Sequence, residues 1–97
     1  MAGQIELIRE KIRGGYYELT RHAEEEKEAD NFEAVDIETA ILNGKIVKRF
    51  THDPRGVRYL IRGNTIDGKE VHIVCRFLKS GKLRIITVYA PEGRQEI

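Results

Sequence analysis

The chain has 97 residues, 40% of them hydrophobic, and a formal net charge of +1. This length suits one compact domain with a single core, so we expect one domain over residues 1–97. No apolar run approaches the ~20 residues that span a bilayer, and the N-terminus has no apolar segment behind a basic start. We therefore expect a soluble, cytoplasmic protein with no membrane partner.

The small net charge conceals a difference between the two halves of the chain. Residues 20–44 carry 2 basic and 8 acidic side chains, whereas residues 45–84 carry 11 basic and 3 acidic side chains. This asymmetry predicts a basic surface that meets phosphate or an acidic partner. The alternative is that acidic helices dock on a basic sheet.

The first half of the chain has the apolar spacing of helices. A hydroxyl at Thr20 can accept a hydrogen bond from a free N–H group of the first helical turn. Glycines at Gly14, Gly15 and Gly44 supply the left-handed residue at which helices often stop. Three helices are expected, over about residues 5–12, 20–30 and 34–43.

From Lys45 onward the apolar period changes to two, which is typical of strands. Four segments are rich in β-branched and aromatic residues: KIVKRF (45–50), VRYLIRG (57–63), EVHIVCRFL (70–78) and LRIITVYA (83–90). The turns between them are DPRG (53–56), DG (67–68) and SG (80–81). Short loops predict an antiparallel meander. The expected fold is α+β, with N-terminal helices packed on a four-stranded antiparallel sheet.

Two of the turns predict a register for the last three strands. If DG and SG are two-residue hairpins, Tyr59 lies opposite Arg76 and His72 lies opposite Tyr89. One face then carries Tyr59, Ile61, His72, Val74, Arg76, Ile85, Thr87 and Tyr89. The other face is the expected core, with Leu60, Val71, Ile73, Cys75, Phe77, Ile86 and Val88. Arg58, Arg62 and Arg84 are expected near the margins of this core face.

The first of these faces combines groups that could cleave RNA. Attack by the RNA's own 2′-hydroxyl needs a base, an acid for the departing 5′-oxygen and a cation for the phosphate. His72 could act as acid or base near neutral pH, and Arg76 could grip two phosphate oxygens. Tyr89 and Tyr59 could stack on an unpaired base or pass a proton.

Structural explanations of the same residues stay open. A strand histidine opposite a tyrosine can be a packed cross-strand pair, and both tyrosines could be packing residues. Arg76 could instead pair with a helix carboxylate such as Glu25 or Glu26.

Signatures of a metal or cofactor are absent from the sequence. The potential ligands His22, His52, His72, Glu25 and Asp53 lack the short spacing of zinc sites. The chain has no phosphate-binding glycine loop and no dinucleotide fingerprint. We therefore expect no cofactor and no metal. Cys75 lies in an apolar run, where we expect a reduced, buried thiol.

Five segments carry a resemblance to a known family: LTRHAEEE (19–26), DIETAILNGKIVKRF (36–50), DPRGVRYLIRG (53–63), EVHIVCRF (70–77) and LRIITVYAP (83–91). Over about residues 19–91 they resemble the landmarks of a bacterial and archaeal family of unknown function placed with the RelE/ParE toxin superfamily. The landmark residues are His22 of HA-x-x-E with Glu25 or Glu26, Asp53 and Arg58 of D-x-R-G-x-R, His72, and Thr87 and Tyr89 of TVY.

This resemblance implies a RelE-like fold and a toxin of a toxin–antitoxin pair. Such a toxin cuts single-stranded mRNA, usually on the ribosome, and is held by a cognate antitoxin, often a small zinc-ribbon protein. The catalytic residues of the well-studied toxins are not reproduced in this sequence, so we assign the roles from the residues themselves. We expect catalysis from His72, Tyr89 and Arg76, substrate binding from Arg58, Tyr59 and Thr87, and support from His22, Glu25 and Asp53. We expect His22 to tie its helix to the sheet or to orient a site group. The alternatives are a non-catalytic module that binds an acidic protein or nucleic acid, and an inactive or gyrase-directed relative.

Overall fold

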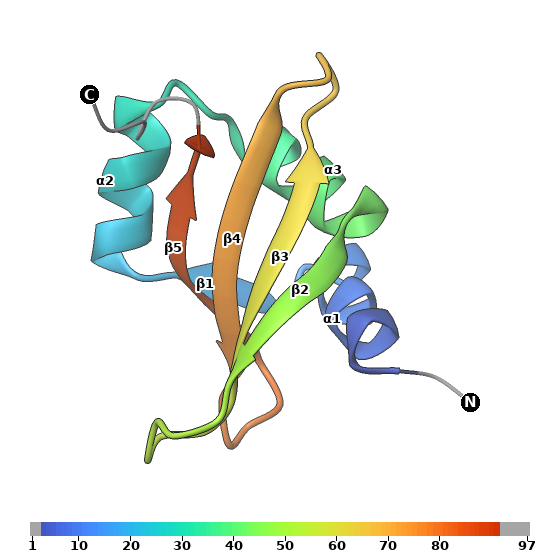
Figure 1. Ribbon diagram of the computed structural model, residues 1–97, viewed down its shortest axis with the longest axis vertical. Helices are drawn as coiled ribbons and strands as arrows, with labels where there is room; N and C mark the ends of the chain where they lie inside the picture. Colours follow the sequence, from blue (N-terminus) through green and yellow to red (C-terminus); the bar gives the residue numbers. More distant parts are fainter. Residues whose placement is uncertain (1–2, 92–97) are drawn as a thin grey trace.

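Three helices form where the apolar spacing predicted them, in a computed structural model that describes residues 3–91. They are α1 (Gln4–Arg13), α2 (Arg21–Ala29) and α3 (Ala34–Asn43) (Figure 1). Thr20 caps α2 as expected, because its Oγ1 accepts a hydrogen bond from the N–H of Ala23 at 3.1 Å. Gly15 takes the left-handed conformation after α1, with φ of 70°.

The four predicted strands are confirmed, but the sheet has a fifth. The strands are β1 (Tyr17–Leu19), β2 (Lys45–Phe50), β3 (Arg58–Asn64), β4 (Glu70–Phe77) and β5 (Leu83–Tyr89). Their order is β1-β5-β4-β3-β2, and β1 runs parallel to β5. The α+β class is therefore correct. The expectation of N-terminal helices on a four-stranded antiparallel sheet is wrong, because β1 lies between α1 and α2 and makes the sheet mixed.

The turn between β3 and β4 is one residue longer than predicted. The N–H of Thr65 donates to the carbonyl of Lys69 at 2.9 Å, so residues 66–68 form a three-residue loop that ends at left-handed Gly68. Tyr59 consequently pairs with Cys75 and not with Arg76. This shift by one residue reverses the faces of β3, so the predicted face of every β3 side chain is wrong.

The pairing of β4 with β5 departs from the predicted pairing in two ways that cancel. Residues 79–81 also form a three-residue loop, since the N–H of Leu78 donates to the carbonyl of Lys82 at 2.8 Å. A bulge then leaves Ile86 without a register partner and restores the predicted register. His72 therefore pairs with Tyr89 as predicted. The bulge also turns Ile85 into the core, contrary to its predicted face.

The core lies between the helices and the inner face of the sheet. Its fully buried side chains include Ile8, Ile37, Ile41, Ile61, Val71, Ile73, Cys75, Leu83, Ile85 and Val88. Burial raises the pKa of the Cys75 thiol to about 12, so the thiol stays protonated and is a poor nucleophile. The expected buried cysteine is confirmed.

Helix α3 packs so closely on β3 that two glycines are needed for room. A Cβ atom added at Gly63 would lie 1.9 Å from the carbonyl oxygen of Ala40, and one added at Gly44 would lie 2.5 Å from the same atom. Gly44 has φ of −88°, so it is not the left-handed stop that the sequence suggested. Position 44 is a glycine because a side chain there would collide with Ala40.

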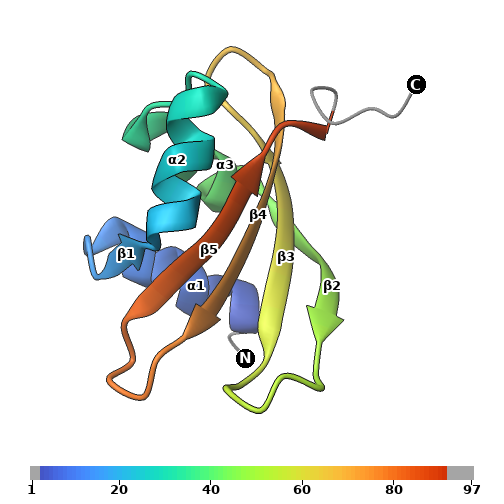
Figure 2. The ribbon, with the colours of Figure 1, turned by 90° about the vertical axis from the view of Figure 1, so that its left-hand side faces the viewer.

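No helix within residues 3–91 covers the outer face of the sheet, which is defined as the face opposite to the helices. Figure 2 shows α1, α2 and α3 on the same side of the strands. Since the helices lie on the other side, the outer face is where side chains can meet a large partner.

Between residues 3 and 91, none of the helices is both long and apolar enough to cross a membrane.

Candidate functional site on the outer face of the sheet

Near the start of β4, three outer-face side chains lie in one row across β3, β4 and β5. His72 pairs with Arg62 on one side and with Tyr89 on the other, and we call this the histidine row. The Nδ1 atom of His72 lies 3.3 Å from the Tyr89 hydroxyl, and its Nε2 atom lies 2.8 Å from Oε2 of Glu70. The His72 side chain is 19% exposed, so a substrate can approach a ring whose orientation is fixed.

The hydrogen bonds of His72 assign its protons. An ionised carboxylate only accepts hydrogen bonds, so Nε2 of His72 donates to Glu70. In the neutral ring, Nδ1 then accepts a hydrogen bond from the Tyr89 hydroxyl. The result is a carboxylate–imidazole–phenol chain in which a proton taken up at Nδ1 creates an imidazolium next to a negative charge. Such a chain suits general acid–base work.

Two members of this site were missed by the sequence analysis. Glu70 lies two residues before His72, so the period of two places it on the same face, and the spacing Glu-x-His could have indicated it. Arg62 was assigned to the margin of the core face because the predicted β3 register was wrong by one residue. It is exposed and adjacent to His72, where a cation for a phosphate is needed.

Near the end of β4, three arginines form a second row, which we call the arginine row. Arg76 pairs with Arg84 of β5. One step beyond the Tyr59–Cys75 pair, the register brings Arg58 of β3 to the other side of Arg76. Because Arg76 and His72 are four residues apart on one strand, their Cα atoms lie about 13 Å apart. Arg76 is therefore not a neighbour of His72, and the predicted group divides into two rows.

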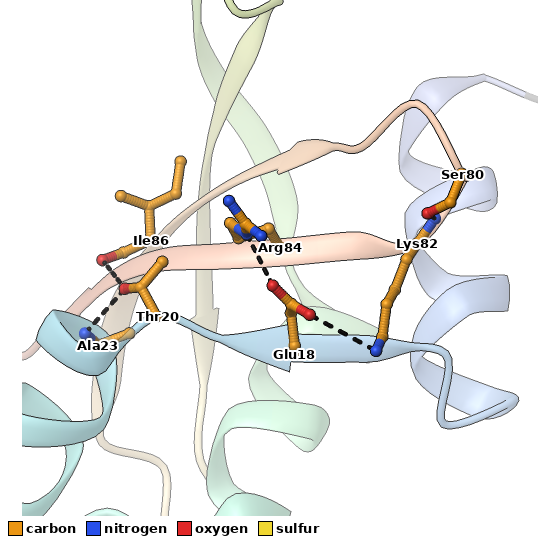
Figure 3. Close-up of polar contacts among 7 residues, drawn as sticks. All are labelled: Glu18, Thr20, Ala23, Ser80, Lys82, Arg84 and Ile86. Atoms are coloured by element: carbon orange, nitrogen blue, oxygen red, sulfur yellow. Dashed lines mark hydrogen bonds and ion pairs between the residues drawn. The ribbon is translucent and has the colours of Figure 1, made fainter.

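The two outer arginines of this row each have a carboxylate partner. The Nε of Arg84 lies 2.7 Å from Oε2 of Glu18 on β1, and Lys82 approaches the same carboxylate at 3.5 Å (Figure 3). The Nε of Arg58 lies 3.3 Å from Oδ2 of Asp53. These cations are paired with carboxylates of the sheet and its loops rather than with those of the acidic helices.

Arg76, in the middle of the row, differs from both neighbours. The residue is only 8% exposed, and within residues 3–91 it has no ion pair and its buried Nε has no hydrogen-bond partner. The Nε of Arg58 also lacks a hydrogen bond, but the Asp53 carboxylate lies 3.3 Å from it. The pairing with Glu25 or Glu26 that the sequence left open is not found. Glu25 lies 3.7 Å from Arg21, and the Glu26 carboxylate contacts His22 and the N–H of Val88.

Hydrogen bonds hold the pKa of two carboxyl groups beside this row below their usual values. For Asp53 the largest cause is the backbone N–H of Arg55, which donates at 2.9 Å, and the charges of Arg55 and Arg58 add to it. For Glu18 the largest cause is the hydrogen bond from Arg84, and Lys82 adds to it. Both carboxylates therefore stay ionised and neutralise their arginines over the physiological range.

The two remaining residues predicted to bind substrate, Tyr59 and Thr87, lie on different faces of the sheet. Tyr59 is 7% exposed and packs edge-on against Phe77 with ring centroids 6.3 Å apart. Its expected place on the open face is wrong, because the longer β3–β4 turn moves it into the core. Thr87 pairs with Val74 between the two rows, on the outer face as predicted.

Helix α2 covers the edge of β5 where β1 ends. The Thr20 hydroxyl donates to the carbonyl of Ile86 at 3.1 Å (Figure 3). The N–H of Val88 donates to Glu26 at 2.9 Å, and the N–H of Ala90 donates to Asp30 at 3.3 Å. The acidic run therefore supplies acceptors to backbone groups that lack a neighbouring strand.

His22 lies on the surface of this helix and away from the histidine row. Its side chain is 64% exposed, and its Nε2 lies 3.3 Å from Oε2 of Glu26. Within HA-x-x-E, Glu26 is the carboxylate that reaches the sheet, whereas Glu25 is exposed. His22 thus contacts the residue that ties α2 to β5, whereas the partners of the His72 ring are Tyr89 and Glu70.

A family model for a domain of unknown function, DUF4258, matches residues 19–90. The chain belongs to the DUF4258 family. No curated protein and no solved structure matches it. The DUF4258 match includes α2, α3, the outer face and both rows, and it confirms the expected membership of a family of unknown function. The link of this DUF4258 protein to the RelE/ParE toxins, and hence the RelE-like fold, stays a prediction.

In the described part of the DUF4258 chain, no three His, Cys, Asp or Glu side chains come together in a way that could hold a metal ion. The five candidate ligands are dispersed. His22 and Glu25 lie on α2, His72 lies on β4, and His52 and Asp53 lie in the loop before β3.

Proposed function

We propose that this DUF4258 protein is an endoribonuclease that cleaves single-stranded RNA with its outer face, without a metal ion. The observation that carries the proposal is the hydrogen-bonded chain of Glu70, His72 and Tyr89 beside Arg62. It offers a base, an acid and a cation side by side on the outer face. A cleavage that uses the 2′-hydroxyl of RNA needs these three groups.

In the proposed reaction, Nδ1 of His72 takes the proton of the 2′-hydroxyl, and Glu70 stabilises the imidazolium. The 2′-oxygen forms a bond to phosphorus while the bond to the 5′-oxygen breaks. Tyr89 donates its proton to that departing oxygen and regains one from His72. Arg62 stabilises the charge on the phosphate. The products are a 2′,3′-cyclic phosphate and a 5′-hydroxyl, and the enzyme returns to its starting protonation.

The proposed setting is that of a cytoplasmic toxin with a RelE-like role. The substrate would be mRNA, with the ribosome as a site of delivery. A cognate antitoxin, such as a small zinc-ribbon protein, would inhibit the enzyme by covering the outer face. Expression with and without the neighbouring gene tests this setting, because toxicity that the neighbour relieves is the expected result.

A non-catalytic module is the second candidate, and two observations favour it. Both ring nitrogens of His72 already have partners, as in a packed cross-strand pair. The arginine row, in turn, is a binding feature that requires no chemistry. Such a module would bind an acidic protein or nucleic acid without turnover, and a gyrase-directed relative would be toxic without loss of mRNA.

The first test compares purified variants on a single-stranded RNA. His72→Ala should lower the cleavage rate at least about 100-fold, since general acid–base groups contribute roughly that much or more. His22→Ala is the matched control, because it removes an exposed histidine that lies off the outer face, and it should cleave like the wild type. Circular dichroism and thermal unfolding would show that both variants fold. Full activity in His72→Ala would end the proposal.

A further inference from the structure

We propose a second site, in which Arg76, Arg55 and Lys79 bind a backbone phosphate of single-stranded RNA away from the bond that is cut. The choice of RNA as the ligand rests on the proposed function, whereas the preference for an anion does not. The site is a hollow of about 490 Å³ at the end of β4, lined by Pro54, Arg55, Arg76, Phe77, Leu78 and Lys79.

The charges of the arginine row provide the first argument. Arg58 and Arg84 are neutralised by Asp53 and Glu18, but Arg76 between them is buried and has no counter-charge within residues 3–91. A buried charge without a partner is costly, and like charges on adjacent strands repel one another. Arg76 is therefore placed where an anion from outside would relieve an unfavourable charge.

The chemistry of the hollow favours a phosphate. The planar guanidinium of Arg76 can donate two parallel hydrogen bonds to phosphate oxygens. Arg55, whose side chain is 74% exposed, and Lys79 add positive charge at the rim. Asp53 is the nearby carboxylate, and it is already shared between Arg55 and Arg58. Phe77 and Leu78 add apolar side chains to the lining, and an apolar surface beside charged groups weakens the screening of their attraction.

The position of the hollow separates binding from chemistry. Arg76 lies about 13 Å along β4 from His72. A phosphate held at Arg76 is therefore not the scissile phosphate but one elsewhere in the same RNA chain. An RNA chain that contacts both the histidine row and the arginine row would cross the outer face along β4. The second site would then position the substrate and would contact no reacting atom.

Arg76→Met tests the site, because it keeps the apolar stem and removes the charge. The variant should bind an uncleavable 2′-O-methyl oligonucleotide at least about tenfold more weakly, as expected for a lost charged hydrogen bond. The slope of log affinity against log salt should fall by about 0.7. On cleavable RNA, KM should rise by more than kcat falls. Arg21→Met, an equal charge change on the exposed surface of α2, should show none of these effects.

Thermal unfolding separates binding from a structural role. Since Arg76→Met removes an unpaired buried charge, its melting temperature should equal or exceed that of the wild type. Inorganic phosphate should raise the melting temperature of the wild type and of Arg21→Met more than that of Arg76→Met. A lower melting temperature together with an unchanged phosphate response would overturn the site, because it would make Arg76 a structural residue.

The two proposals fail in different ways. If the wild type does not cleave RNA but Arg76→Met still loses phosphate and oligonucleotide binding, the anion site stands and the endoribonuclease fails. If cleavage occurs and Arg76→Met has the wild-type KM and affinity, the second site fails alone. A variant that loses the phosphate response but binds the oligonucleotide like the wild type would refute the RNA ligand and indicate a free phosphate ion.

Discussion

The Asp53 side chain holds the loop between β2 and β3 and at the same time neutralises one arginine of the outer face. It accepts a hydrogen bond from the backbone N–H of Arg55 and lies 3.3 Å from Nε of Arg58. These interactions favour the ionised form and lower the pKa of Asp53 from its ordinary value of 3.8. The loop that borders the arginine row should therefore loosen in acid.

Asp53→Asn tests this coupling between charge and stability. A lowered pKa contributes stability that is fully present above the ordinary value and is lost as the pH falls through the folded-state pKa. The wild type should therefore melt at a higher temperature than Asp53→Asn at pH 7, and the difference should shrink below about pH 4. Melting curves of both proteins from pH 7 to pH 2.5 measure it. A difference that stays constant over this range would show that the carboxylate charge is not responsible.

Individual site residues were predictable where local pattern decides their position. Strand alternation placed His72 and Thr87 on the outer face, and the apolar run buried Cys75. Glu70 was detectable from its spacing to His72. That Arg76 is buried without a carboxylate was not predictable, because it depends on where Glu18 and Asp53 lie after folding.

At the scale of elements, α2 lies along the part of the β5 edge with which β1 does not pair. Glu26 accepts a hydrogen bond from the N–H of Val88, and its side chain is only 10% exposed. The adjacent Glu25 is 67% exposed and lies 3.7 Å from Arg21. The two neighbouring glutamates thus have the same charge and different environments.

These neighbours form a matched pair for mutation. Glu26→Ala should lower the free energy of unfolding by about 1–3 kcal/mol, because it leaves the N–H of Val88 without its acceptor at the sheet edge. Glu25→Ala should change it by less than about 0.5 kcal/mol, as is usual for exposed positions. Urea unfolding of both variants provides the comparison. Equal losses would mean that the acidic run contributes through its charge on the helix and not through the edge of β5.

Elements were easier to predict than their registration. The three helices and four strands follow from apolar periods of 3.6 and 2, which are local properties. The register depends on turn length, and both turns read as two-residue hairpins have three residues. The His72–Tyr89 pair was predicted correctly only because the bulge at Ile86 offsets the longer turn. Strand β1 was missed because it has three residues and pairs with a strand about 66 positions away.

At the scale of the whole molecule, the two faces of the sheet have separate roles. The inner face and the helices bury the core, and α2 closes one edge. The histidine and arginine rows lie on the outer face, opposite to the helices that Figure 2 shows on one side of the strands. Arg58 and Arg84 pair with Asp53 and Glu18 and not with the acidic helices, which lie on the other side of the sheet. This arrangement favours a partner with a long run of negative charge.

The most direct test of the central claim, RNA cleavage at the histidine row, is a cleavage assay on a single-stranded RNA that carries one 2′-deoxy nucleotide. The purified protein should cut this RNA in the presence of EDTA and leave 2′,3′-cyclic phosphate and 5′-hydroxyl ends. It should not cut after the deoxy position, because that sugar lacks the attacking hydroxyl. Intact RNA after incubation, or cleavage after the deoxy position at the rate of the other positions, would contradict the claim.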